Sequence, residues 1–129
     1  MRLMITAALL LAMMGLTGCL TSQSESIAPP VSPEQLTQMR DQFRREDREA
    51  RVGLVTAVLP TANLAAVGSV PVNDFTVGDI ITFIDSNGKT LTLGHVEAIN
   101  RNSITVRYAN PGPHGRAPVR GDAGVRAIH

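Results

Sequence analysis

The chain has 129 residues, enough for one small domain in addition to a targeting segment. It carries 12 basic and 11 acidic residues, and this near balance argues against a protein that binds nucleic acid through its overall charge. The single cysteine excludes a fold held by internal disulfides. An aromatic content of only 3% means that the core must be built mainly from aliphatic side chains.

The first 18 residues have the composition of a bacterial secretion signal. Arg2 supplies a positive charge, and residues 3–14 form an apolar run that is too short to span a membrane comfortably as a helix. The sequence Leu16-Thr17-Gly18-Cys19 follows, and it resembles the lipobox of bacterial lipoproteins. The resemblance implies that a signal peptidase recognises Leu16, Thr17 and Gly18 and cuts before Cys19. It also implies that Cys19 carries a diacylglyceryl group, often with a further acyl chain on its new amino group.

The expected partner of this protein is therefore a membrane, reached through lipid on Cys19. Two or three acyl chains give stable anchoring. In Gram-negative lipoproteins an Asp after the lipidated cysteine resembles an inner-membrane retention signal, and this chain has Leu20 there. The resemblance implies the periplasmic face of the outer membrane if the host is Gram-negative. An uncleaved anchor, or a plain secretory signal with an incidental cysteine, is the alternative.

Residues 19–32 are rich in Ser, Thr, Gln and Pro, a composition typical of a flexible tether. A charged amphipathic helix is expected over residues 33–51. Ser32 is a natural N-cap, Pro33 suits the first helical position, and Gly53 stops the pattern. Within this helix, Asp47 is four residues before Arg51, so the two side chains are expected to pair.

Arg40, Arg44 and Arg48 form a basic row at four-residue spacing on the predicted helix. One interpretation is a surface that contacts anionic phospholipid or a cell-wall polymer. The other is an ordinary solvated helix face, because acidic residues are interleaved with the arginines. The second interpretation is favoured by the sequence alone.

Residues 52–129 are rich in Val, Ile and Thr and predict a small β-barrel domain. We expect mainly β structure: a curled antiparallel sheet or barrel of five to six strands preceded by the one helix. The expected strands are Val52–Leu59, Asn63–Ser69, Asp79–Asp85, Thr90–Ile99, Ser103–Ala109 and Gly124–Ile128. Asn87-Gly88 predicts a type I′ hairpin turn. Gly94 marks a change in the apolar phase of its strand, which predicts a β-bulge or a sharp bend there.

Two Gly-Asp pairs, Gly78-Asp79 and Gly121-Asp122, each precede an expected strand. This two-part pattern, together with a preceding hairpin, resembles small SH3-like barrels of periplasmic bacterial proteins, such as the terminal domain of a flagellar assembly protein. The resemblance covers residues 52–128 and implies a fold only.

The residues with catalytic chemistry are few and scattered. His95, His114 and His129 are not at metal-ligand spacing, so neither a metal nor another cofactor is expected. Asp79, Asp85 and Glu97 fall on neighbouring expected strands, but turn-capping or solvated roles are more typical of such acids.

Two functions follow from the sequence. The favoured one is a lipid-anchored lipoprotein that presents a non-catalytic barrel to a protein or cell-wall partner at the cell envelope. The alternative is a small envelope hydrolase that uses acidic or His residues near Asp79, His95 and Glu97. The expected interaction surface consists of Arg40, Arg44, Arg48, Arg101, Arg107, Tyr108 and the loop through His114.

Overall fold

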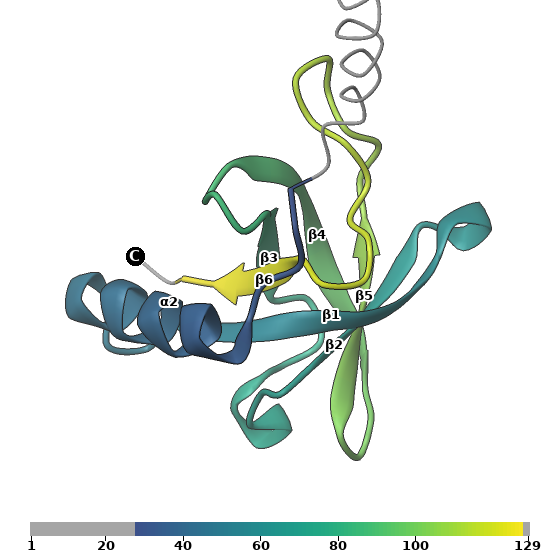
Figure 1. The fold of residues 1–129 in the computed structure, drawn as a ribbon. Coiled ribbons are helices and arrows are strands. Elements are labelled where there is room, and N and C mark those ends of the chain that lie inside the picture. The colour runs from purple at the N-terminus through teal and green to yellow at the C-terminus, as the bar shows by residue number, and fades with distance from the viewer. Residues whose placement is uncertain (1–27, 128–129) are drawn as a thin grey trace, which may run out of the picture.

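The computed structural model describes residues 28–127, so the predicted signal and Cys19 lie outside the described residues. Residues 28–127 form one α-helix followed by six antiparallel strands that close into a barrel (Figure 1). This confirms the predicted fold class. The elements are α2 (Pro33–Glu46), β1 (Arg51–Leu59), β2 (Leu64–Gly68), β3 (Ile80–Ile84), β4 (Thr90–Ile99), β5 (Ser103–Tyr108) and β6 (Ala123–Arg126). Two single turns of 3₁₀-helix, η2 (Pro60–Ala62) and η3 (Val72–Asp74), lie between strands.

The strand order around the barrel is β1-β2-β5-β4-β3-β6, and β6 closes the ring by pairing with both β1 and β3. β1 with β2, β3 with β4 and β4 with β5 are antiparallel neighbours along the chain. The final strand is short, but every one of its residues is buried.

Side chains that alternate along the strands fill the barrel interior. In β5, Ile104, Val106 and Tyr108 point inward as the alternation predicts, and Arg107 is exposed. The Phe83 ring packs edge-on against the Tyr108 ring, with 6.2 Å between the ring centres. Aliphatic side chains make up most of the rest, as the composition requires: Val55, Ala65, Val67, Ile81, Leu91 and Val96.

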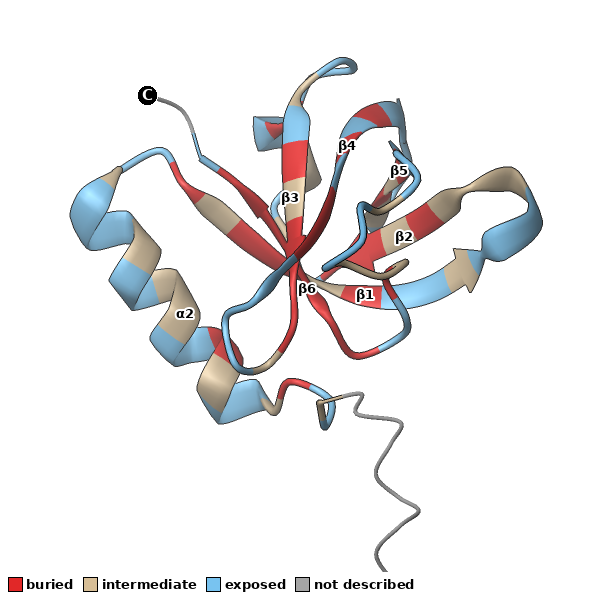
Figure 2. Cartoon of the chain, turned by 90° about the horizontal axis from the view of Figure 1, so that it is seen from above, coloured by how far each residue is buried: buried red, intermediate tan, exposed pale blue. Residues whose placement is uncertain are grey.

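A second apolar cluster lies on the outside of the barrel, under α2 (Figure 2). Gly53 and Gly124 pair with each other and face the interior, where a Cβ on either would meet the Val67 side chain. Their neighbours Val52 and Val125 therefore face outward, where they form a cluster with Leu36 of α2. The helix thus packs against the outer wall of the barrel instead of covering its mouth.

The helix begins as predicted but ends earlier. The Ser32 side chain accepts a hydrogen bond from the Gln35 N–H, and the Gln35 side chain accepts one from the Ser32 N–H, which completes a capping box. The predicted end at residue 51 is wrong, because α2 stops at Glu46 and the backbone of Asp47 is extended. Arg51 instead begins β1 and pairs with Arg126. Residues 47–51 therefore do not continue the helix, because Arg51 belongs to the strand pairing that closes the barrel.

Two local predictions in the β3–β4 hairpin are also wrong. The bulge is not at Gly94, which pairs regularly with Ile81. The strand instead has two bulges, at Leu91, where β4 carries one residue more than β3, and at Glu97, where it carries one more than β5. The exposed Leu93 shows that the phase changes between Leu91 and Leu93. The turn is not type I′, since only Gly88 has a positive φ, +84°. The Asp85 carboxylate there accepts hydrogen bonds from the N–H groups of Asn87 and Lys89.

The predicted tether, residues 19–32, lies mostly outside the described residues, but its final residues belong to the folded domain. Val31 is buried and donates its N–H to the Gly121 carbonyl oxygen at 2.8 Å. Pro30 lies so close to Gly121 that a Cβ there would stand 2.7 Å from Pro30 Cβ. The chain therefore enters the domain beside the loop formed by residues 109–122 (Figure 1).

Candidate functional site

An open groove of about 750 Å³ lies between α2 and the loops at one end of the barrel. Its first wall carries the basic row of α2 and the segment after it. Its second wall is formed by the loop that follows β2 and by the turn between β4 and β5. We call it the arginine groove, and it is lined by Arg40, Arg44, Arg48, Ala50, Arg51, Val52, Ser69, Val70, Pro71, Asp74, Arg101 and Asn102.

The helix sets the spacing of the first wall. Arg40 and Arg44 are one helical turn apart, which corresponds to about 6 Å along the axis. Arg48 comes after the helix has ended, yet it lines the same groove. The predicted row Arg40, Arg44 and Arg48 is therefore brought together on one surface, and Arg101 of the β4–β5 turn joins it from the other wall.

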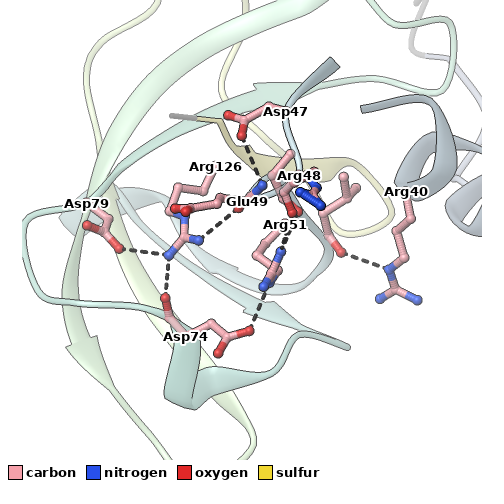
Figure 3. A network of polar contacts seen from close by, with 10 residues as sticks. Arg40, Asp47, Arg48, Glu49, Arg51, Asp74, Asp79 and Arg126 are labelled. Atoms are coloured by element: carbon pink, nitrogen blue, oxygen red, sulfur yellow. Dashed lines mark hydrogen bonds and ion pairs between the residues drawn. The ribbon is translucent and has the colours of Figure 1, made fainter. Parts of the chain in front are cut away.

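Two of the groove arginines are held by the fold. Arg40 donates from Nε to the Val52 carbonyl oxygen at 3.1 Å (Figure 3). Its terminal nitrogen donates to the Ser69 carbonyl oxygen. Ser69 has a φ of +58°, an uncommon value for a residue with a side chain, and Arg40 binds the carbonyl of this unusual backbone position. Arg40 thereby links the two walls of the groove.

Arg51 is the second held arginine. Its Nε donates to Asp74 Oδ2 at 2.9 Å, and its terminal nitrogen contacts the Arg48 and Ala50 carbonyl oxygens. The predicted partner was Asp47, and this prediction is wrong because Arg51 lies in β1 and no longer on the helix. The pairing with Asp74 could not be read from sequence spacing, since the two residues are 23 positions apart.

Arg126 in turn fixes the position of Asp74. Its guanidinium lies over the Phe75 ring, 4.8 Å from the centroid, and donates to the Asp74 carbonyl oxygen. It also contacts Asp79 Oδ2 at 3.3 Å and the Glu49 carbonyl oxygen at 2.9 Å (Figure 3). One buried side chain of the last strand thus connects the segment after α2, the η3 turn and the start of β3.

The other three groove arginines are not held by hydrogen bonds or ion pairs as Arg40 and Arg51 are. Among residues 28–127, the guanidinium groups of Arg44, Arg48 and Arg101 make no hydrogen bond or ion pair, and all three residues are exposed. Arg116 shows the contrast. It makes two hydrogen bonds to the buried Asp122 carboxylate, and these raise its pKa above the ordinary arginine value.

The groove is strongly positive although the whole chain is nearly neutral. Five arginines and one aspartate line it, a formal charge of +4. Asp74 is ion-paired with Arg51, so no lining carboxylate remains to neutralise the exposed arginines. A concave surface with charge of one sign concentrates its field and attracts ions of the opposite sign.

The remaining residues of the predicted interaction surface lie elsewhere. Arg107 forms a two-point ion pair with Glu97, at 2.9 and 3.1 Å, on the outer face of β4 and β5. Tyr108 is buried in the core, so its place on an exposed surface is not supported: it belongs to the inward face of β5. His114 is exposed in the loop that joins β5 to β6 and does not line the arginine groove.

The acids considered for catalysis have different partners. Asp79 accepts from the Thr76 N–H and from Arg126, Glu97 is paired with Arg107, and Asp85 accepts from the backbone of its own turn. His95 is exposed on β4, where it pairs with Ile80.

Within residues 28–127 no three His, Cys, Asp or Glu side chains gather to hold a metal ion. Helix α2, the one α-helix of that part of the chain, is neither long nor apolar enough to cross a bilayer.

Comparison with protein-family models found no match, and comparisons with curated protein sequences and with solved structures found none either. Function therefore has to be inferred from the arginine groove and from the sequence.

Proposed function

We propose that this protein is a lipid-anchored protein of the bacterial cell envelope whose barrel is a non-catalytic binding module for an anionic ligand. The resemblance of Leu16-Thr17-Gly18-Cys19 to a lipobox supports the anchor. One observation carries the binding function: Arg44, Arg48 and Arg101 converge on a concave surface without a carboxylate to neutralise them. Guanidinium groups recognise phosphate and carboxylate through paired hydrogen bonds, and such groups are the ligands they would take here.

The groove favours binding over the alternative hydrolase. A general acid or base must be free to exchange a proton with the substrate. Asp79 and Glu97 are each ion-paired with a different arginine. Within the described residues, His95 makes no hydrogen bond to an acidic side chain. The arginine groove, in contrast, offers free donors and a volume within the range of small-molecule sites, about 300–1,000 Å³.

The test is a titration of the full chain, purified with its lipid in a non-ionic detergent, with tripolyphosphate. Arg44→Ala and Arg101→Ala are each expected to weaken binding several-fold, because each removes a donor from one wall of the groove. Arg45→Ala is the matched control, since Arg45 lies on the same helix and does not line the groove. Equal losses for Arg44→Ala and Arg45→Ala would show that the groove is not the binding site.

A further inference from the structure

The two walls of the arginine groove bear on the size of its ligand. Arg44 and Arg48 lie on the helix side, and Arg101 lies on the β4–β5 turn. Each guanidinium can pair with an anionic group through two parallel hydrogen bonds, so arginines on opposite walls suit a ligand that carries more than one anionic group. A groove of about 750 Å³ is also far larger than a single oxyanion needs.

The position of the groove relative to the chain entry indicates where the ligand is. The described chain enters at residue 28, at the end of the barrel that carries the loop of residues 109–122 (Figure 1). The β2–β3 loop and the β4–β5 turn, which form the second wall, lie at the opposite end (Figure 1). Residue 28 is nine residues after Cys19, so the intervening chain spans at most about 30 Å. An anchor at Cys19 attaches the domain to the bilayer through its entry end, and the groove loops are at the opposite end of the barrel.

We infer that the groove binds a linear polyanion, a polymer of the envelope with repeated phosphate or carboxylate groups, and not the headgroups of the membrane that anchors the protein. This inference rests on the proposed function, because it specifies the ligand of the same groove. A polymer crossing from α2 to the β4–β5 turn meets Arg44 or Arg48 first and Arg101 next. A bilayer surface reaches the entry end of the barrel before it reaches these arginines.

The first experiment compares probes of different length with the full lipid-bearing chain in non-ionic detergent. Long-chain polyphosphate and poly-L-glutamate represent the two anionic chemistries, and inorganic phosphate represents a single group. At least one polymer is expected to bind ten-fold or more tightly than inorganic phosphate, and the preferred polymer identifies the chemistry. If tripolyphosphate binds in the groove but neither polymer binds more tightly than inorganic phosphate, the proposed function stands and the linear ligand is wrong.

The salt dependence of polymer binding reports how many arginines take part. For a flexible single-stranded polyanion, log K falls against log salt with a slope of about −0.7 per neutralised charge. Three arginines predict a slope of about −2, hence a loss of roughly 20-fold in affinity between 50 and 200 mM salt. Arg44→Ala or Arg101→Ala is expected to reduce the slope by about 0.7, and Arg45→Ala is expected to leave it unchanged. A slope that no groove variant alters would overturn the inference.

The second experiment measures the orientation on the bilayer. Asn102→Cys places a thiol on the β4–β5 turn, and Pro113→Cys places one on the loop at the entry end; both positions are exposed. Each variant of the full chain is labelled with a fluorophore and reconstituted in phosphatidylcholine vesicles that contain a headgroup-labelled acceptor lipid. Energy transfer from position 113 is expected to exceed transfer from position 102. Equal transfer, or greater transfer from position 102, would overturn the placement of the groove away from the membrane.

Discussion

Gly94 is required by the close approach of two strands. A Cβ at this position would stand 2.7 Å from the Arg107 carbonyl oxygen and 2.8 Å from the Val106 Cγ1. The sequence marked Gly94 as special because the apolar phase of β4 changes near it. The reason is different, since the bulges of β4 lie at Leu91 and Glu97 and Gly94 provides space for β5. A single sequence does not distinguish these two uses of a strand glycine.

Gly94→Ala is therefore expected to destabilise the barrel by about 1–3 kcal/mol, because the backbone of β5 must shift to admit a methyl group. Urea unfolding followed by circular dichroism measures the change. Gly112→Ala is the matched control, since a Cβ there meets nothing within 4 Å and its φ is not in the left-handed region. If the two variants were equally stable, the packing of β4 on β5 would have to be looser than described.

At the scale of elements, α2 shows what local signals can and cannot predict. Its start was predictable because Ser32, Pro33 and Gln35 act on their own neighbours in sequence. Its end was not, because Arg51 pairs with Arg126, and these two residues begin and end the barrel and are far apart in sequence. The strands were predictable for the same reason as the helix start: alternation and turn residues are local patterns.

Ser32→Ala tests the helix start. It removes the side-chain acceptor of the Gln35 N–H and is expected to cost about 1 kcal/mol in the free energy of unfolding. Thr37→Ala is the comparison, because Thr37 is exposed within the same helix and alanine is the better helix former. Chemical denaturation of both variants measures the change in the free energy of unfolding. A loss for Thr37→Ala as large as that for Ser32→Ala would argue against a stabilising cap.

The arginine groove illustrates the same limit for function. The spacing of Arg40, Arg44 and Arg48 suggested a basic row, but interleaved acids made a solvated face the favoured interpretation. What singles out this row is its surroundings in the fold: Arg101 and the Ser69 carbonyl on the second wall, and the Asp74–Arg51 pair that joins the two walls. These groups come from β1, the β2–β3 loop and the β4–β5 turn, which only the closed barrel brings to one place. No local pattern identifies Ser69 or Asp74 as part of a site.

At the scale of the whole molecule, the anchor decides what the groove can reach. Cys19→Ser is expected to abolish both cleavage of the signal and acylation, because the thiol that would receive the lipid is absent. The intact mass of the chain measures cleavage, and metabolic labelling with a palmitate analogue measures acylation. Ser22→Ala, three residues further on, is the control and is expected to be processed normally. Processing of Cys19→Ser at the same position would rule out the lipobox interpretation.

The closure of the barrel by β6 has a consequence for the order in which the protein can fold. β6 is the last strand of the chain, yet it lies between β1 and β3 and forms part of the surface on which α2 packs. While a chain is still being synthesised or threaded through a pore from its N-terminal end, β1 and β3 have no partner between them and α2 has only part of its docking surface. The contacts that complete the barrel are therefore distant in sequence and form late. Until residues 123–126 have been synthesised or have emerged from the pore, the barrel cannot close. Chaperones and transport proteins that bind unfolded polypeptide can bind the chain throughout that interval.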